Sequence, residues 1–259
     1  MTAHQDVDET APTIFRGAPF TPAQRPLREP VAAFFTLGYP LLLLAVFGAI
    51  YGNKPRREFA GLGTVDVSVP SYMGIIIAST GLLNLAIVMA TYRERGVLRR
   101  LRVTPLSPFS VLVSQATVNA VVTIIGATLL IIGGRVFFGL RFGGNPTVVL
   151  AAFLLSTLSF IALGFVLSNL ANTARSAQAI GMVIFYPMIF LSGASIPLAI
   201  LPASLQAAAH IYPLFYVVDL LGKAWAGAAI STMLVPAGVL TLMLVAAGGL
   251  ANKTFRWSQ

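Results

Sequence analysis

The sequence predicts an all-α integral membrane protein with six transmembrane helices. Of its 259 residues, 57% are hydrophobic and 10% are charged, and the mean hydropathy is +0.85. Because a soluble domain usually carries about a quarter charged residues, this composition indicates a membrane protein. A spanning helix needs about 20 mostly apolar residues, so the chain has room for about six of them.

The charged residues are concentrated in short connectors between the apolar runs. Seventeen Lys and Arg residues against eight acidic residues give a net charge of +9. Basic residues in such connectors act as topology determinants, so we predict no nucleic-acid partner. Cysteine is absent, which excludes disulfides, thiolate metal sites and cysteine nucleophiles.

Ionisable residues are rare within the apolar runs themselves. Only Asp219, of the eight acids, comes near a predicted span, and His210 is the only histidine beyond the N-terminal segment. Proton relays and ion-coupled pumps place such groups at membrane depth, and metalloproteases need sets of His and Glu ligands. We therefore predict no metal site and no catalytic residue in this chain.

Residues 1–30 are polar, proline-rich and of mixed charge. Acidic residues come first and the next apolar run has the length of a membrane span, so a cleaved signal peptide is not expected. We predict a cytoplasmic N-terminal tail with room for a short interfacial helix at 21–29.

A transmembrane domain follows over residues 31–251, and a short cytoplasmic tail, 252–259, comes after it. The connector between the first two spans would extend to Pro70, and Arg135 and Arg141 would lie in the loop after the third span. The six spans are the long apolar runs between polar connectors, at 31–51, 71–90, 109–132, 147–167, 179–196 and 232–251.

The segment between the fifth and sixth spans is apolar but interrupted. Residues 193–222 contain Pro197, Pro202 and Pro213, together with His210 and Asp219. Non-helical backbone persists at membrane depth only where protein or water covers its polar groups. We therefore expect a broken, re-entrant or interfacial helical element there and not a seventh crossing.

Charge asymmetry orients the predicted spans. With six spans and both termini inside, the cytoplasmic segments hold eleven of the seventeen basic residues and the outer segments hold six. The inverted orientation would place the five arginines of 93–102 outside, against the strongest charge signal in the chain. A seventh span would move Lys253 and Arg256 outside as well. Both termini are therefore predicted to be cytoplasmic.

The connector "TYRERGVLRRLRVTPLSPF", residues 91–109, carries those five arginines. Each arginine at the bilayer centre would cost about 2.5–3.5 kcal/mol, so the segment must lie outside the hydrocarbon. We predict a helix over 94–103 that ends at Thr104-Pro105. At 100° per residue, Val97, Leu98 and Leu101 share one arc with Glu94.

Two interpretations of this connector remain open from the residues alone. It could be a positive-inside loop with no further role, or a short amphipathic helix that docks on a partner or on anionic headgroups. No phosphate-binding loop accompanies it, since Gly222-Lys223 is followed by Ala224 and Val217 stands where the leading glycine belongs. If ATP drives this protein, the ATPase is a separate chain.

Two segments resemble one known family. "YRERGVLRRLRVTPLSP" resembles the cytoplasmic loop after the second span of type-2 ATP-binding-cassette (ABC) exporter permeases. "RSAQAIGMVIFYPMIFLSGASIPLAILPASLQAAAHIYPLFYVVDLLGKA", residues 175–224, resembles the family's fifth span, its Pro-x-x-x-x-Pro element and the His-x-x-Pro-Leu run before span six. The resemblance covers about residues 30–255.

This resemblance implies a cytoplasmic coupling helix at 93–103, between spans two and three, that docks on a nucleotide-binding subunit. Its contact residues would be Arg93, Glu94, Arg95, Gly96, Val97, Leu98, Arg99, Arg100, Leu101, Arg102, Thr104 and Pro105. It also implies a re-entrant external gate at 193–222, shaped by Gly193, Pro197, Pro202, His210 and Pro213. ATP and Mg would be bound by two copies of the partner ATPase. A second permease copy or a paralogue would complete a dimer in the lipid bilayer.

The expected function is that of the membrane subunit of an exporter for a hydrophobic or amphipathic compound, in the drug- and antibiotic-exporting branch. The short N-terminal segment differs from the long amphipathic helix of polysaccharide exporters. An apolar pathway would be lined by Phe185, Tyr186 and Phe190, in the inner membrane of a prokaryote. Alternatives are export of a lipid, a glycan precursor or sodium, a membrane assembly factor or scaffold, and a secondary transporter that holds a cation with backbone carbonyls.

Overall fold

The computed structural model describes residues 37–59, 61–97, 108–195, 198 and 201–254. Helices and short connectors make up this part of the chain, and it contains no strand. The helices are α2 (Tyr39–Tyr51), a 3₁₀ turn (Arg57–Phe59), α3 (Thr64–Ala78), a π-helical segment (Ser79–Leu85), α4 (Ala86–Glu94), α6 (Pro108–Phe138), α7 (Pro146–Leu170), α8 (Ala174–Leu191), α9 (Ala203–Ala209), α10 (Pro213–Ala226) and α11 (Ile230–Thr254).

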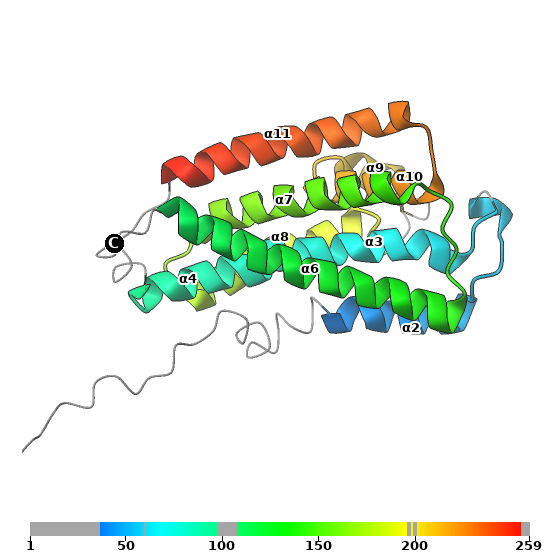
Figure 1. The fold of residues 1–259 in the computed structure, drawn as a ribbon, viewed down its shortest axis with the longest axis horizontal. Coiled ribbons are helices and arrows are strands. Elements are labelled where there is room, and N and C mark those ends of the chain that lie inside the picture. The colour runs from blue at the N-terminus through cyan, green and yellow to red at the C-terminus, as the bar shows by residue number, and fades with distance from the viewer. Residues whose placement is uncertain (1–36, 60, 98–107, 196–197, 199–200, 255–259) are drawn as a thin grey trace, which may run out of the picture.

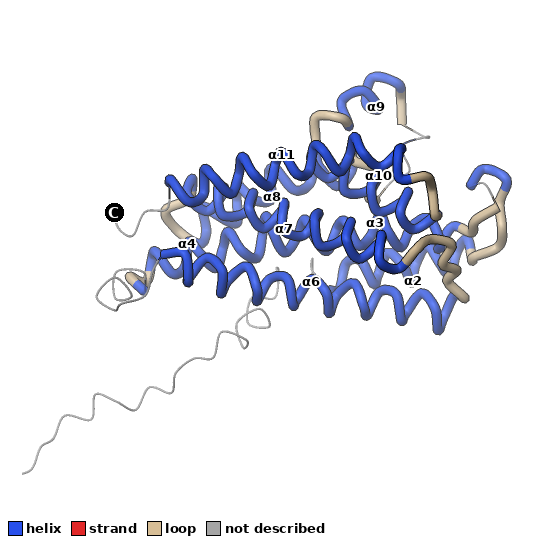
Figure 2. The backbone as a smooth tube through the Cα atoms, turned by 45° about the horizontal axis from the view of Figure 1, so that its top comes forward, coloured by secondary structure: helices blue, strands red, loops and turns tan. Residues whose placement is uncertain are grey.

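The long helices lie side by side in a bundle (Figure 1). In both views, α11 lies on one side, α2 and α6 lie on the other, and α3, α4 and α7 run between them (Figures 1 and 2). α3, the π-helical segment and α4 follow one another without a break, and we call this continuous helix the central rod, Thr64–Glu94. Its middle is almost wholly buried by its neighbours, whereas its last residue, Glu94, is exposed.

Five helices of the described chain are long and apolar enough to cross a membrane, which confirms a multi-pass, all-helical protein. α2 is also apolar but has only 13 residues. The predicted count of six thus depends on the segment before α2. Residues 1–36, which include the predicted tail and the start of the predicted first span, lie outside the described residues. The five spanning helices are Thr64–Glu94, Ser110–Phe138, Pro146–Leu170, Ala174–Leu191 and Ile230–Ala251.

The second span is longer than predicted. The expected range of 71–90 is wrong, because the helix begins at Thr64 and includes Pro70. Gly63 is its N-cap, and the Asp66 carboxylate accepts a hydrogen bond of 2.9 Å from the Gly63 N–H. This bond satisfies one of the free donors at a helix start. The helix therefore starts within the polar connector. Pro70 is compatible with the helix interior because neighbouring helices can compensate for the backbone group that it leaves free.

The ends of two further spans also differ from the prediction. α6 continues to Phe138, which places Arg135 in a helix and not in a loop. α8 begins at Ala174, five residues early, because the Thr173 hydroxyl caps the Ser176 N–H at 3.1 Å. It ends at Leu191 because Gly193 adopts a left-handed φ of 82°. Side-chain caps and one glycine thus set boundaries that hydropathy alone misplaced.

The contact between α7 and the central rod is unusually close. A Cβ atom placed on Gly164 would lie 2.0 Å from the carbonyl oxygen of Gly81, and a Cβ on Gly81 would lie 2.5 Å from that of Phe160. Only glycine allows two helix backbones to approach this far, as at other helix–helix contacts in membranes. This crossing lies at the π-helical segment.

A polar seam joins the central rod to α6. Asn84 donates to the Asn119 side chain at 3.0 Å, the Thr123 hydroxyl donates to that of Thr80 at 2.8 Å, and Gln115 donates to Tyr92 at 3.1 Å. Unpaired polar groups cost several kcal/mol in a bilayer, so paired ones hold helices in register. Hydropathy does not reveal this seam, because its residues are spread singly through apolar runs.

Two short helices occupy the region between α8 and α11. α9 has 7 residues and α10 has 14, so neither meets the length of the five spanning helices. Pro202 immediately precedes α9, and Pro213 is the first residue of α10, where proline is well tolerated. One face of α10 is buried in the bundle, through Leu214, Val217, Leu220, Leu221, Ala224 and Trp225.

Candidate functional site

The central rod connects two sites at opposite ends of the bundle. The first is the connector that the sequence predicts as a coupling helix. Its predicted start is wrong: Glu94 is the last residue of α4, and no separate helix begins there. Gly96 adopts a left-handed φ of 65°, which ends the rod. Val97 follows the turn, and Leu98, Arg99, Arg100, Leu101, Arg102, Thr104 and Pro105 lie outside the described residues.

Arg93, the last residue but one of the rod, binds the end of α7. Its guanidinium donates to the carbonyl oxygens of Ser168 at 2.8 Å and Ala171 at 2.9 Å, and to the side-chain oxygen of Asn169 at 3.0 Å. The last carbonyls of a helix lack internal partners and carry the negative end of its dipole. The half-buried guanidinium of Arg93 donates hydrogen bonds to these carbonyls, and its positive charge lies at the negative end of the dipole.

Glu94 binds the start of the next helix. Its carboxylate accepts a hydrogen bond of 3.0 Å from the backbone N–H of Ala174, the first residue of α8. The positive end of a helix dipole favours an anion there. Adjacent residues of opposite charge therefore hold the two helix ends on either side of residues 171–173, and we call these contacts the Arg93–Glu94 clamp.

The clamp changes the role expected of Glu94. The sequence places it on an arc with Val97, Leu98 and Leu101 that faces a partner, whereas the structure turns its carboxylate onto α8 of the same chain. The "NTARS" capping signal at 172–176 is the sequence feature that marks a helix start within reach. Arg95, the C-cap of α4, is exposed.

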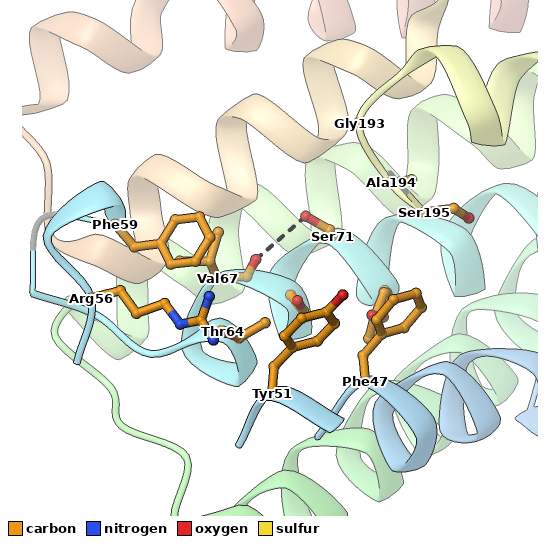
Figure 3. Close-up of a pocket in the computed structure, with 12 residues that line it drawn as sticks. Phe47, Tyr51, Arg56, Phe59, Thr64, Val67, Ser71, Gly193, Ala194 and Ser195 are labelled. Atoms are coloured by element: carbon orange, nitrogen blue, oxygen red, sulfur yellow. Dashed lines mark hydrogen bonds between the residues drawn. The ribbon is translucent and has the colours of Figure 1, made fainter. Parts of the chain in front are cut away.

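The second site is a pocket of about 440 Å³ at the other end of the rod. Figure 3 shows its walls, which come from α2, the loop before α3, the first turns of α3 and the turn after α8. We call it the outer pocket, after its predicted side of the membrane. It is lined by Phe47, Tyr51, Arg56, Phe59, Thr64, Val67, Ser68, Ser71, Tyr72, Gly193, Ala194 and Ser195.

Aromatic rings and one cation distinguish the outer pocket. The rings of Phe47 and Tyr51 stack with centroids 6.1 Å apart, and the Arg56 guanidinium lies 5.5 Å from the centroid of Tyr51. The hydroxyl oxygen of Thr64 is buried without a hydrogen-bond partner in the described structure. An apolar cavity with a few polar groups is the usual form of a small-molecule site.

Asp66 holds the loops around the outer pocket. This carboxylate is fully buried and accepts hydrogen bonds from the Gly63 N–H at 2.9 Å, the Asn53 side chain at 2.8 Å and the Arg141 N–H at 2.7 Å. It therefore joins the rod to the loop that carries Arg56 and to the connector between α6 and α7. The expectation that only Asp219 comes near a span is wrong, since Asp66 lies in the first turn of one.

The predicted gate residues are only partly brought together. Gly193 lines the outer pocket, and Ser195 beside it lies 3.3 Å from the hydroxyl of Tyr39. His210 is away from that pocket and packs its ring 4.2 Å from that of Phe215. Pro202 and Pro213 mark the starts of the two short helices, while Pro197 lies outside the described residues.

The predicted pathway residues on α8 face different ways. Phe185 is fully buried in the core, whereas Tyr186 and Phe190 are 40% and 47% exposed. In this conformation, Phe185 therefore faces no open surface. Among the described residues, no group of three His, Cys, Asp or Glu side chains is placed to hold a metal ion.

Comparison with known proteins agrees with this architecture. Residues 23–225 match the ABC-2 type transporter family. The chain is 30% identical over 198 residues to ycf38 of Porphyra purpurea, named as a transport permease, covering 74% of this chain and 67% of that protein. It is 27% identical over 213 residues to DrrC of Mycobacterium tuberculosis H37Rv, named as a doxorubicin resistance ABC transporter permease, covering 80% and 75%.

A further relative has a similar name but a shorter match. YbhR of Escherichia coli K12, named as a multidrug ABC transporter permease, is 27% identical over 152 residues, which cover 59% of this chain and 41% of that protein. The family match spans most of the bundle, from before α2 to the end of α10. The chain therefore belongs to the ABC-2 type transporter family and is a multi-pass membrane permease of the type-2 ABC class.

Proposed function

We propose that this chain is the membrane subunit of an exporter that moves a hydrophobic or amphipathic compound out of the cell, with energy from a separate ABC ATPase. The observation that carries the proposal is the central rod. One uninterrupted helix joins the connector at 93–103 to the outer pocket. Because the rod is one continuous helix, a displacement at its Glu94 end would be carried along its axis to the outer pocket.

The coupling step follows from the clamp. We propose that the ATPase docks on residues 93–103 and displaces the end of the rod when it binds ATP. Because Arg93 holds the end of α7 and Glu94 holds the start of α8, the same displacement would move both helices. Three helices would thus respond to one contact. ATP and Mg would be bound by the partner, and this chain would contribute no catalytic group.

The orientation follows from charge. We propose that the 93–103 end and both termini are cytoplasmic, in the inner membrane of a prokaryote, since this arrangement keeps the arginine cluster inside. The α9–α10 region would then lie toward the outer side. Its two short helices and the Gly193 turn beside the outer pocket support a re-entrant external gate there.

A second permease copy would complete the transporter. α8 exposes a row of large apolar side chains, among them Val183 at 74%, Tyr186 at 40% and Phe190 at 47%. In a membrane, such a face packs either against lipid or against another helix. We propose that it faces a second copy or a paralogue, so that two permeases and two ATPases form the complex.

Relatives named for multidrug and doxorubicin resistance support a drug-like substrate for this chain as well. Lipid export remains the second candidate, since the bundle opens a second apolar cavity of about 410 Å³ between α6 and α7.

The test is reconstitution with a candidate ATPase encoded beside this chain. Purified together in proteoliposomes, the two proteins should hydrolyse ATP faster than the ATPase alone and accumulate a fluorescent drug only when ATP is present. An ATPase variant without its catalytic carboxylate is the control for leak. If no candidate ATPase copurifies and none is stimulated, the exporter function is refuted.

A further inference from the structure

The outer pocket has the shape and lining of a ligand site. Its volume of about 440 Å³ falls within the range of small-molecule sites, and its walls are mostly apolar. Phe47, Tyr51 and Tyr72 supply three aromatic rings from two helices, and Phe59 and Val67 add apolar surface (Figure 3). Such walls fit a flat or chain-like apolar body.

One cation reaches into this apolar space. In the part of the chain that the structure describes, the only ion pair is Lys223 with Asp219, so Arg56 has no carboxylate partner there. None of the described side chains that line the outer pocket is acidic. An exposed guanidinium over the ring of Tyr51, with no carboxylate partner, offers several N–H donors to a carboxylate, sulfonate or phosphate.

A second polar group points to the same ligand chemistry. Thr64 lines the outer pocket, and its hydroxyl oxygen is buried beneath the surface of that pocket without a partner among the described residues. Leaving a buried hydroxyl unpaired costs about 1–3 kcal/mol, so a Thr64 side chain that turned its hydroxyl toward an acceptor group on a ligand would recover that energy. Thr64 begins the rod and Arg56 lies in the loop before it, and Asp66 binds Asn53 and Gly63 of the same loop.

We propose that the outer pocket binds an amphipathic anion. Its apolar body would lie among Phe47, Tyr51 and Tyr72, and its anionic group would accept hydrogen bonds from Arg56 and Thr64. In the cell, the site would hold an exported compound or an outer-leaflet lipid, and this role rests on the proposed function. The binding itself does not, because it needs only the permease.

The probe is 1-anilinonaphthalene-8-sulfonate, whose fluorescence rises in apolar sites. N-phenyl-1-naphthylamine is its matched neutral partner, since it has the same rings without the sulfonate. Both are titrated into the purified permease in phosphatidylcholine nanodiscs, and the signal of empty discs is subtracted. The second cavity also contains an arginine, so all proteins carry Arg135→Gln to remove that competing cation.

Arg56→Gln should weaken binding of the sulfonate about tenfold, the usual size of one lost charge-assisted hydrogen bond. It should leave binding of the neutral amine unchanged. Thr64→Val should weaken the sulfonate two- to threefold, by the smaller energy of a neutral hydrogen bond. The matched controls are Arg57→Gln and Thr157→Val, an adjacent arginine and a second unpartnered buried threonine, neither of which lines the outer pocket.

Two results overturn the proposal. The first is unchanged sulfonate binding in Arg56→Gln, and the second is an equal loss for both probes, which would mean a collapsed pocket. A third arm distinguishes the source of the ligand. In this arm, phosphatidylglycerol is added to the discs. If the natural occupant is a lipid, it should lower sulfonate binding more in the protein with Arg56 than in Arg56→Gln. If the natural occupant is a free amphipathic anion, it should lower sulfonate binding equally in both proteins. Selective binding without ATP-driven transport would refute the exporter alone.

Discussion

The carboxylate of Glu94 accepts a hydrogen bond of 3.0 Å from the backbone N–H of Ala174. This contact joins the last residue of the central rod to the first residue of α8, 80 positions later. Together with Arg93, which binds the end of α7, it makes this end of the rod a junction of three helices. Motion of the predicted coupling connector therefore has a direct route into α7 and α8.

Removing the Glu94 carboxylate should uncouple transport from ATP hydrolysis. Glu94→Ala leaves the start of α8 without its cap, which is worth about 0.3–1 kcal/mol in stability. We expect ATP hydrolysis by the complex to persist while the transport rate falls about tenfold, because the push no longer reaches α8. Arg95→Ala is the matched control, as Arg95 is exposed and next in sequence. Equal transport in both variants would contradict the role of the clamp.

Arg93 should not be replaceable by lysine. Its guanidinium makes three hydrogen bonds to residues 168, 169 and 171, and a single ammonium cannot match that fork. We expect Arg93→Lys to lower the free energy of unfolding by about 1–3 kcal/mol, the cost of unsatisfied partners. Thermal unfolding in detergent measures it, with Arg95→Lys as the control. A melting temperature unchanged by Arg93→Lys would show that the hydrogen bonds contribute nothing.

Asp66 should be the most sensitive acid in the described chain. In Asp66→Asn, an NH₂ group replaces one of the two oxygens that accept hydrogen bonds from surrounding N–H groups, so two donors face each other there. The substitution also removes the negative charge of the carboxylate. We expect the free energy of unfolding to fall by about 3–5 kcal/mol, as when a buried charged network is broken. Asp219→Asn is the control, because its pair with Lys223 is partly exposed and worth about 0–1 kcal/mol. Similar melting temperatures for the two variants would contradict this difference.

Two buried threonines should respond in opposite directions to the same change. The hydroxyl of Thr157 has no partner among the described residues, so Thr157→Val should raise stability by about 1 kcal/mol. The Thr123 hydroxyl lies 2.8 Å from that of Thr80, to which it donates, and 2.7 Å from the carbonyl oxygen of Asn119, so Thr123→Val should lower stability by about 1–2 kcal/mol. Unfolding midpoints in a common detergent give both values. A stability gain in Thr123→Val would contradict the polar seam, and a loss in Thr157→Val would contradict the unpaired hydroxyl.

The close crossing at Gly164 should not tolerate one extra carbon atom. In Gly164→Ala, the new Cβ would meet the Gly81 carbonyl at 2.0 Å, so α7 and the rod must separate. We expect loss of folded protein, seen as aggregation in gel filtration. Gly238→Ala in α11 has open space and should be neutral or stabilise the helix by about 0.5–1 kcal/mol. Normal folding of Gly164→Ala would mean that the crossing relaxes easily.

Hydropathy predicted the helical class and the presence of several membrane spans, because long apolar segments have few alternatives in a bilayer. It misplaced their ends where polar side chains decide. The Gly63–Asp66 cap starts the second span seven residues earlier than predicted, and the Thr173 cap starts α8 five residues earlier. Such caps depend on single side chains, which an average over a window of residues does not resolve.

The candidate sites were only partly visible in the sequence. The arginine-rich connector and the proline-interrupted segment stand out by composition, and the family resemblance rested on them. The outer pocket does not, since its lining comes from α2, α3 and the turn after α8. Likewise, nothing near Glu94 in sequence indicates that its partner is Ala174.

The sequence by itself determined that this protein is a multi-pass helical permease, where its charge gathers and to which family it belongs. Only the tertiary structure decided what each polar group does. Three charged side chains bind parts of the chain that are distant in sequence, namely Arg93, Glu94 and Asp66. The glycines at which α7 contacts the rod are also far apart in sequence. The physical reason is that apolar surface is a property of a segment, whereas a hydrogen bond or a close contact needs a partner that folding brings within a few ångströms.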